Sequence, residues 1–466
     1  MRARAALLLL PLVLIYACGG GGGGGGGGSV PLSPPAPPGP PPPPPPPGPP
    51  APPPPPPPPP GTVGGTVPAG LPKTFGLGLA NGPGSGVTWL QGAGVPFDYR
   101  YQYLAGGVNT GGDWETWNTP PGQFVNYYFA DCTTTNTIPV FTYYEMLQSN
   151  PSAGANESQR DLSNMTNAST MNAYFANWKL LMQTCGSYGK VVVVHVEPDL
   201  WGYIEQAVTN ASNSAANVPA SVNGSGFADC AGLPDTAQGF ALALLHMRDL
   251  YAKNVVLGIH LSTWGNLANW SSPTTGLNVA NLAAQSSAFL ETCGLTGNPN
   301  GISTWDVFFG ERLDRDADFY KIVNGDPNEW YTSADYANLL QYFQLVSQTI
   351  QRRFFMWQLP CGNYYFKSCN DTNGHYQDPT PQYYLEGYPT NVNMKSWANG
   401  GCLGLLFGGG SGNCTSYQDA DADGVTNPAT VPSNNLGNTA TFSDDDGGYL
   451  RLRCGNYYSQ GEIQLP

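Results

Sequence analysis

The sequence predicts an α/β fold in which a single (β/α)8 barrel of the TIM type follows a disordered stalk rich in glycine and proline. Three observations support this prediction. Eight short segments of strand-like composition recur through residues 62–466, with helix-like segments between most of them. No proline or glycine block divides this region, which favours one large domain. The run of four valines at 191–194 lacks polar alternation, as in a strand that is buried on both faces.

Residues 1–18 have the pattern of a secretory signal peptide. Arg2 and Arg4 precede an apolar stretch at 5–15 that is too short to span a bilayer. The letters IYAC follow at 15–18 and resemble the lipobox of bacterial lipoproteins. That resemblance implies lipidation of Cys18 and a lipoprotein of the bacterial cell surface or outer membrane. An ordinary signal peptide with a secreted product is the alternative.

Residues 19–61 form the predicted linker. Ten glycines at 19–28 are followed by a segment that is almost entirely proline up to Pro60. Neither composition can bury apolar surface, and the proline part favours an extended polyproline II rod. At ~3.1 Å per residue this rod would reach on the order of 90 Å. We expect a flexible joint and a stiff stalk between a membrane anchor and the catalytic domain at 62–466.

The strands and helices of the barrel alternate along residues 62–466. Strands are predicted at 74–80, 97–104, 138–144, 191–197, 255–261, 304–309, 353–359 and 402–407. Between them, helical periodicity is clearest at 170–185, 234–251 and 333–350, and a last helix is predicted within 447–458. In the helix at 234–251, Asp235 and Gln238 have the spacing of a capping box. A β-sandwich would not have helices of this length between its strands.

Charge and cysteine content limit the classes of partner. The chain has 18 Lys and Arg against 32 Asp and Glu, so its net charge is −14. An acidic surface disfavours nucleic acid and anionic membranes as partners. Nine of the ten cysteines lie in 62–466 and, in an exported protein, are expected to form disulfides rather than metal sites. Cys361 with Cys369, and Cys402 with Cys414, have the spacing to close short loops.

Acidic residues dominate the ends of the predicted strands, where a barrel of this type places its chemistry. Glu145 follows the third strand, Glu197 and Asp199 follow the fourth, and Glu311 and Asp314 follow the sixth. Hydrolysis of a glycosidic bond requires two carboxyl groups, one that protonates the leaving oxygen and one that activates water or attacks the sugar. The alternative to a catalytic role for Glu311 and Asp314 is that these two residues only solvate a surface loop.

Aromatic and polar residues near the same strand ends are candidates for sugar binding, because aromatic faces stack on pyranose rings. These candidates are Trp114, Trp201, Trp264, Trp357, Gln358, His195, His260 and Arg100. Other roles remain open for some of these residues. One alternative for Arg100 is a buried ion pair with Glu197. The two histidines are either metal ligands or, more simply, core or substrate-positioning residues.

The segment VEPD at 196–199, within HVEPDLWGYIEQ, resembles the IEPD strand end of the family-six cellulases. In that family the aspartate is the catalytic acid, so the resemblance implies that Asp199 is the proton donor, with Glu197 assisting. The arginine and aspartate motif that those enzymes carry on the preceding strand is missing here, where VFTYYEMLQ stands at 140–148. The resemblance therefore implies a secreted barrel glycoside hydrolase of another, poorly characterised family.

A separate motif, DADADGVTNP at 419–428, resembles the start of a calcium-binding loop. Asp419, Asp421 and Asp423 occupy alternate positions before a glycine. Pro432 stands where an EF-hand would have its closing glutamate. We expect either a structural calcium ion or a solvated acidic turn.

Together these patterns predict a monomeric glycoside hydrolase that acts on a neutral polysaccharide or oligosaccharide by carboxylate acid/base catalysis. Asp199 is the expected acid, and the second carboxylate comes from Glu311, Asp314 or Glu145. The chemistry requires no cofactor. Two alternatives belong to other classes: a noncatalytic glycan-binding surface lipoprotein, and a barrel lyase or metal-assisted hydrolase.

Overall fold

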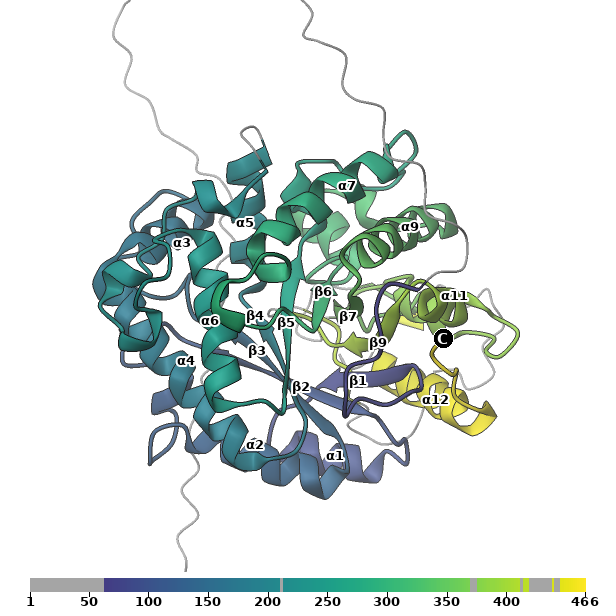
Figure 1. Cartoon of the computed structure of the whole chain (residues 1–466). Helices are drawn as coiled ribbons and strands as arrows, with labels where there is room; N and C mark the ends of the chain where they lie inside the picture. The colour runs from purple at the N-terminus through teal and green to yellow at the C-terminus, as the bar shows by residue number, and fades with distance from the viewer. Residues whose placement is uncertain (1–62, 210–212, 369–374, 411–413, 419–437, 440–444) are drawn as a thin grey trace, which may run out of the picture. The chain divides into compact units, whose positions relative to one another are not determined.

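Eight parallel strands close into a barrel, and helices surround it (Figure 1). The computed structural model describes residues 63–209, 213–368, 375–410, 414–418, 438–439 and 445–466. The strands are β1 (Gly76–Ala80), β2 (Tyr99–Ala105), β3 (Ile138–Tyr144), β4 (Val192–Val196), β5 (Val255–Leu261), β6 (Val307–Gly310), β7 (Arg353–Leu359) and β9 (Cys402–Phe407). Each pairs with the next, and β9 closes the barrel against β1. The predicted (β/α)8 barrel is thus confirmed.

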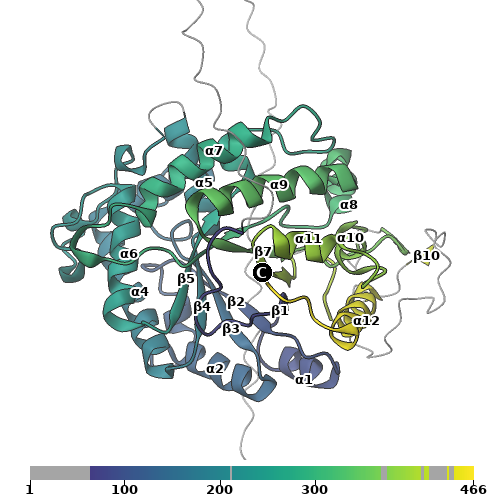
Figure 2. The same cartoon turned by 45° about the vertical axis from the view of Figure 1, so that its right-hand side comes forward.

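The helices alternate with the strands, as predicted. They are α1 (Ser85–Gly92), α2 (Gln123–Thr135), α3 (Glu157–Thr166), α4 (Ala168–Tyr188), α5 (Pro198–Thr209), α6 (Ala237–Tyr251), α7 (Val279–Leu290), α8 (Ala317–Phe319), α9 (Ser333–Ile350), α10 (Thr380–Leu385), α11 (Asn393–Asn399) and α12 (Asp445–Gln460). Figure 2 shows α10, α11 and α12 gathered on one side of the barrel. A small parallel pair, β8 (Phe366–Lys367) with β10 (Asn438–Thr439), lies outside the barrel.

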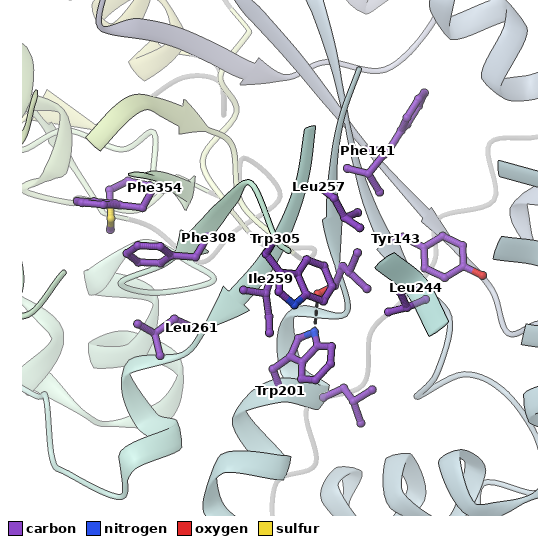
Figure 3. Packing of buried hydrophobic residues seen from close by; sticks show 14 of the residues in the cluster. Phe141, Tyr143, Trp201, Leu244, Leu257, Ile259, Leu261, Trp305, Phe308 and Phe354 are labelled. Carbon is purple, nitrogen blue, oxygen red and sulfur yellow. Dashed lines mark hydrogen bonds between the residues drawn. The ribbon is translucent and has the colours of Figure 1, made fainter. Parts of the chain in front are cut away.

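Two apolar layers result from the alternation of side chains along each strand. Val193 of β4 points into the barrel and joins a cluster with Tyr101 and Phe355, whereas Val192, Val194 and Val196 pack outward. Figure 3 shows part of the outer layer, in which Trp201 and Trp305 fill the space between strands and helices. The valine run therefore needs no polar position, because both faces of β4 are covered.

The predicted start of the helix at 234–251 is wrong in its capping residue. Thr236, not Asp235, caps α6, and its side chain accepts a hydrogen bond from the Gly239 N–H. The Asp235 carboxylate instead accepts from the backbone N–H groups of Val222 and Gly224. The Asp235 carboxylate thus stabilises the loop that precedes α6.

The disulfide prediction is wrong for Cys402. Cys402 lies at the first position of β9, and its thiol is free and buried. Free and buried thiols are also found in other elements, at Cys132, Cys185, Cys230, Cys293 and Cys454. Cys414 follows the opposite end of β9. A strand of this length separates its ends by roughly 16–20 Å, whereas a disulfide needs Cα atoms within about 7 Å. Cys369 lies outside the described residues.

Several sequence predictions concern residues that the structure does not describe. These are the signal peptide with Cys18, the linker at 19–61 and the calcium loop with Asp419, Asp421 and Asp423. They stay predictions. Within the described ranges, no helix combines the length and apolar character needed to cross a membrane, and no cluster of three or more His, Cys, Asp or Glu side chains is arranged to hold a metal ion.

Candidate active site

Carboxyl groups from two different strand ends meet at the C-terminal rim of the barrel. Asp199 lies in the first turn of α5, directly after β4, and Glu311 follows β6. The two side chains interact electrostatically, and the Tyr144 hydroxyl at the end of β3 donates a 2.8 Å hydrogen bond to Asp199 Oδ2. The barrel thus brings together residues that are more than 100 positions apart in the chain.

The environment of Asp199 favours a carboxyl group that holds its proton to a higher pH than a free aspartate does. Burial and then the charge of Glu311 raise the pKa of Asp199 to about 6, while the hydrogen bond from Tyr144 acts in the opposite direction. Pro198 occupies the first position of α5 and presents Asp199 at the helix N-terminus. A carboxyl group with a raised pKa beside a second carboxylate is the arrangement of a general acid and its partner.

Glu197, two residues before Asp199, has a different environment. It is buried, and its carboxylate accepts hydrogen bonds from the backbone N–H of Glu145 (3.0 Å), the N–H of Met146 (3.2 Å) and the Tyr174 hydroxyl (2.9 Å). Burial raises its pKa to about 8 against these donors. The carboxyl group therefore joins the loop after β3 to the end of β4 and does not reach the rim.

The backbone at Glu197 separates the two acids. Its φ angle is +45°, in the left-handed region that a non-glycine residue rarely adopts. This conformation ends β4 and starts α5, so that Glu197 turns into the protein while Asp199 stays half-buried at the rim. We infer that the hydrogen bonds to Glu197 hold the turn that positions Asp199.

Arg100 is not the partner of Glu197, so the buried ion pair considered from the sequence is absent. The Arg100 guanidinium points away from the barrel interior, where Nε donates to Asn81 Oδ1 at 2.6 Å and the group lies over the Tyr128 ring of α2. Its nearest carboxylate is that of Asp131, at 4.0 Å. Arg100 is fully buried there, so the structure does not support it as a sugar-binding residue.

The remaining candidate acids differ in exposure. Glu145 is fully buried, with Oε2 accepting from the Gly107 N–H at 2.7 Å, and burial raises its pKa well above the usual range. Asp314 is partly exposed and is held by Arg315 and the Tyr320 hydroxyl. Of the predicted second carboxylates, Glu311 alone both interacts with Asp199 and lacks a charged arginine or lysine partner among the described residues.

The predicted tryptophan platforms divide into two groups. Trp114 and Trp201 are fully buried, with their indole N–H groups bonded to Asn177 and to the Val196 carbonyl, so neither ring offers a face to a sugar. Trp264, in contrast, is only partly buried and packs 4.9 Å from the Tyr203 ring on α5. This aromatic pair lies close to the acid, because the charge of Asp199, after burial, raises the pKa of Tyr203.

A floor of rings lies inside the barrel beneath the carboxyl groups. His195 stacks on Phe309 with ring centroids 4.2 Å apart, and it packs against Trp357 with centroids 4.6 Å apart and ring planes at 75°. Trp357 is buried, so it supports the site from below. Gln358, in a left-handed conformation, accepts a 2.5 Å hydrogen bond from the Tyr103 hydroxyl.

Four residues of the site were not predicted from the sequence. Tyr144 and Tyr103 contact Asp199 and Gln358 by hydrogen bonds, Thr142 contacts His195, and Asp161 is buried near Asp199 with no hydrogen-bond partner on either oxygen among the described residues. The alternation of β2 and β3 was the available signal for three of them, because Tyr103 and Thr142 point inward and Tyr144 ends its strand. Asp161 lies on α3, and no local pattern indicated it.

A hollow of about 870 Å³ lies at the opposite end of the barrel, lined by the residues that precede β5, β6 and β7. Its arginines are used in the fold: Arg248 bonds to Asp306 and Asp249, and Arg352 bonds to the Trp305 carbonyl. This end of such barrels serves stability rather than catalysis. We therefore place the candidate site at the rim and not in this hollow.

No protein-family model matches the sequence, and no curated protein matches it. Among solved structures, the chain is similar to a β-1,4-D-mannanase from Cryptopygus antarcticus, with 12% identity, 86% of this chain and 96% of that chain covered, and a TM-score of 0.45. It is also similar to an endo-β-1,4-mannanase from Cellulomonas fimi, with 9% identity, 81% of this chain and 74% of that chain covered, and a TM-score of 0.41. A third similar structure is a D-psicose 3-epimerase from Clostridium cellulolyticum, with 8% identity, 82% of this chain and 99% of that chain covered, and a TM-score of 0.35. At such identities the likeness concerns the fold alone.

Proposed function

We propose that the protein is a glycoside hydrolase that acts on a neutral polysaccharide, with Asp199 as the general acid and Glu311 as the second carboxylate. The observation that carries this proposal is the pairing of Asp199 with Glu311 at the rim. Burial and then the charge of Glu311 raise the pKa of Asp199 to about 6, which makes Asp199 a better proton donor near neutral pH than a free aspartate. Hydrolysis of a glycosidic bond requires such a donor beside a second carboxylate.

In the proposed reaction Asp199 donates its proton to the glycosidic oxygen as the bond to the sugar breaks. The Glu311 carboxylate stabilises the positive charge that develops on the sugar ring, and it either activates water or attacks the anomeric carbon. The Tyr144 hydroxyl then stabilises the anion that remains on Asp199. Trp264 and Tyr203 offer a partly exposed aromatic surface beside the acid, suited to the apolar face of a pyranose ring.

The charge of the rim favours a neutral substrate. After burial and Tyr101, the charges of Asp199, Glu311 and Asp314 raise the pKa of Tyr103, so three carboxyl groups lie near this position. An anionic polysaccharide would be repelled by them and by the net charge of −14. The proposal includes a lipid anchor on Cys18 and a location at the bacterial cell surface or outer membrane.

The test is to incubate the full-length protein with neutral glucans, xylans, mannans and arabinans and to analyse the products by mass spectrometry. Asp199→Asn is expected to lower kcat by about 10²–10⁴-fold, the usual effect of losing a general acid. Glu462→Gln, which changes an exposed acid, is the control. Equal activity of Asp199→Asn and the parent would overturn the assignment of the acid, and glycan binding without products would favour the noncatalytic lipoprotein.

A further inference from the structure

Two buried histidines lie side by side beneath the carboxyl groups. His195 of β4 and His260 of β5 are both 0% exposed, and His195 Nε2 is 2.9 Å from His260 Nδ1. A contact of this length between two ring nitrogens requires one N–H, shared as donor on one side and acceptor on the other. Phe309 and Trp357 pack against the His195 ring and exclude water from it.

Each end of the pair faces one further polar group. His195 Nδ1 lies 3.4 Å from the Thr142 hydroxyl on β3. At the other end His260 Nε2 lies 3.6 Å from Glu311 Oε1 and has no hydrogen-bond partner among the described residues. The four groups, Thr142, His195, His260 and Glu311, therefore form a line that crosses the barrel from β3 to the loop after β6.

The chemistry of the two ends determines which nitrogens carry protons. The Glu311 carboxylate only accepts hydrogen bonds, so a lone pair on His260 Nε2 would face an anion, whereas an N–H there is attracted to it. With the proton on Nε2, His260 Nδ1 is an acceptor, and His195 must donate from Nε2. His195 Nδ1 is then the acceptor for the Thr142 hydroxyl. Burial lowers the pKa of His195 well below the usual range, in agreement with a neutral ring.

A charged His260 is the competing arrangement, and the geometry disfavours it. A fully buried imidazolium needs a close carboxylate to offset its lost hydration. The separation of 3.6 Å from Glu311 is longer than a charge-assisted hydrogen bond, which is typically about 2.7–2.9 Å. A neutral His260 tolerates this distance, and a small movement of Glu311 on substrate binding would close it.

We infer that Thr142, His195 and His260 form a relay of neutral, hydrogen-bonded groups that points an N–H at Glu311 and so positions the second carboxylate. This inference rests on the role of Glu311 given under the proposed function. The three residues act through Glu311 and do not themselves touch substrate. The other titratable groups that face Glu311 are Asp199 from α5, Asp314 from its own loop and Tyr103 from β2.

The first test needs no substrate. In the full-length protein labelled with ¹⁵N histidine, NMR distinguishes the two neutral tautomers and the imidazolium. His195 and His260, two of only four histidines, are expected to be neutral with the proton on Nε2 at pH 7. Thr142→Val should change the Nδ1 shift of His195, whereas Thr142→Ser keeps the hydroxyl and should not. A proton on His260 Nδ1, an imidazolium, or equal shifts in the two variants would overturn the relay.

The second test separates positioning from folding. His260→Leu removes the N–H and is expected to lower kcat by about 10- to 100-fold while KM changes by less than about threefold. His260→Gln places an amide N–H near Nε2 and should restore most of this loss. Equal kcat values in the two variants, both folded by circular dichroism, would contradict the inference. If no glycan is hydrolysed but the tautomers are as expected, the proposed function fails and the relay stands.

Discussion

At the scale of single residues, hydrogen bonds and burial decide what each acid of the rim can do. Asp199 and Glu197 are separated by one residue, yet one is half-buried beside Glu311 and the other accepts three hydrogen bonds inside the protein. A general acid must exchange its proton with substrate, so exposure matters as much as a raised pKa. We therefore propose Asp199 as the catalytic acid and Glu197 as a residue that positions it.

The hydroxyl of Tyr144 offers a direct test of this assignment. It donates to the ionised form of Asp199 and so lowers the pKa of that acid. Tyr144→Phe removes the donor, and the pKa of Asp199 should rise. Because the acid must be protonated to work, activity is lost above its pKa, and the alkaline limb of kcat/KM should move to higher pH.

The measurement is the pH dependence of kcat/KM on whichever glycan the protein hydrolyses. Tyr127→Phe, at a position 52% exposed on α2, is the matched control and should leave the limb in place. A limb that moves to lower pH, or stays in place in Tyr144→Phe, would show that another group is the acid.

At the scale of elements, the close packing of α5 against the loop after β5 positions the aromatic surface of the site. An added Cβ at Gly202 of α5 would lie 2.4 Å from Trp264 Cη2, so the glycine allows the indole ring to lie against the helix. The same helix carries Asp199 at its start and Tyr203 one residue after the glycine. Acid and aromatic surface are thus coupled through one helix.

Gly202→Ala should therefore displace Trp264. We expect a loss of about 1–3 kcal/mol in the free energy of unfolding from overpacking, together with a raised KM for a substrate that stacks on the ring. Urea denaturation and steady-state kinetics measure the two effects. Gly92→Ala at the end of α1, where an added Cβ meets nothing within 4 Å, is the control and should be neutral or slightly stabilising. An unchanged KM in Gly202→Ala would argue against Trp264 as a sugar platform.

At the scale of the whole molecule, buried carboxyl groups make stability depend on pH. Burial raises the pKa of Glu197 to about 8, of Glu205 to about 7 and of Asp98 to about 6. The unfolded values are about 4.3 for Glu and about 3.9 for Asp. Between these values and the folded ones, the folded state binds more protons than the unfolded state, so the free energy of unfolding falls as pH rises.

We expect the protein to be more stable at pH 5 than at pH 8, measured as the urea midpoint at each pH. Glu205→Gln removes one such group, which is buried on α5 and accepts a 2.6 Å hydrogen bond from Ser286. The variant should show a smaller decline in stability between about pH 4.5 and 7. Glu291→Gln, at a partly exposed position outside this set of acids, should keep the full decline. A parent protein that gains stability across this range would contradict the prediction.

Local patterns in the sequence were sufficient to predict the barrel. Period-two and fully apolar segments located all eight strands, and helical periodicity located α9 at its observed bounds, because strand and helix formation depend on neighbours along the chain. The rule that chemistry lies at the C-terminal ends of strands selected Glu145, Glu197, Asp199, Glu311 and Asp314 as candidates, and among these Asp199 and Glu311 interact at the rim. The cap of α6 was missed because Asp235 and Thr236 are both good capping residues.

Only the tertiary structure decided which of these residues face the site. Trp114 and Trp201 look like sugar platforms in the sequence, but their burial depends on helices that lie far away in the chain. The left-handed backbone at Glu197 likewise follows from no local pattern in the sequence. The hydrogen bond from Tyr144 to Asp199 and the contacts of His195 with Thr142 and His260 link residues of separate strands. Contacts of this kind form only when the barrel closes, because closure brings into one layer side chains that no local pattern connects.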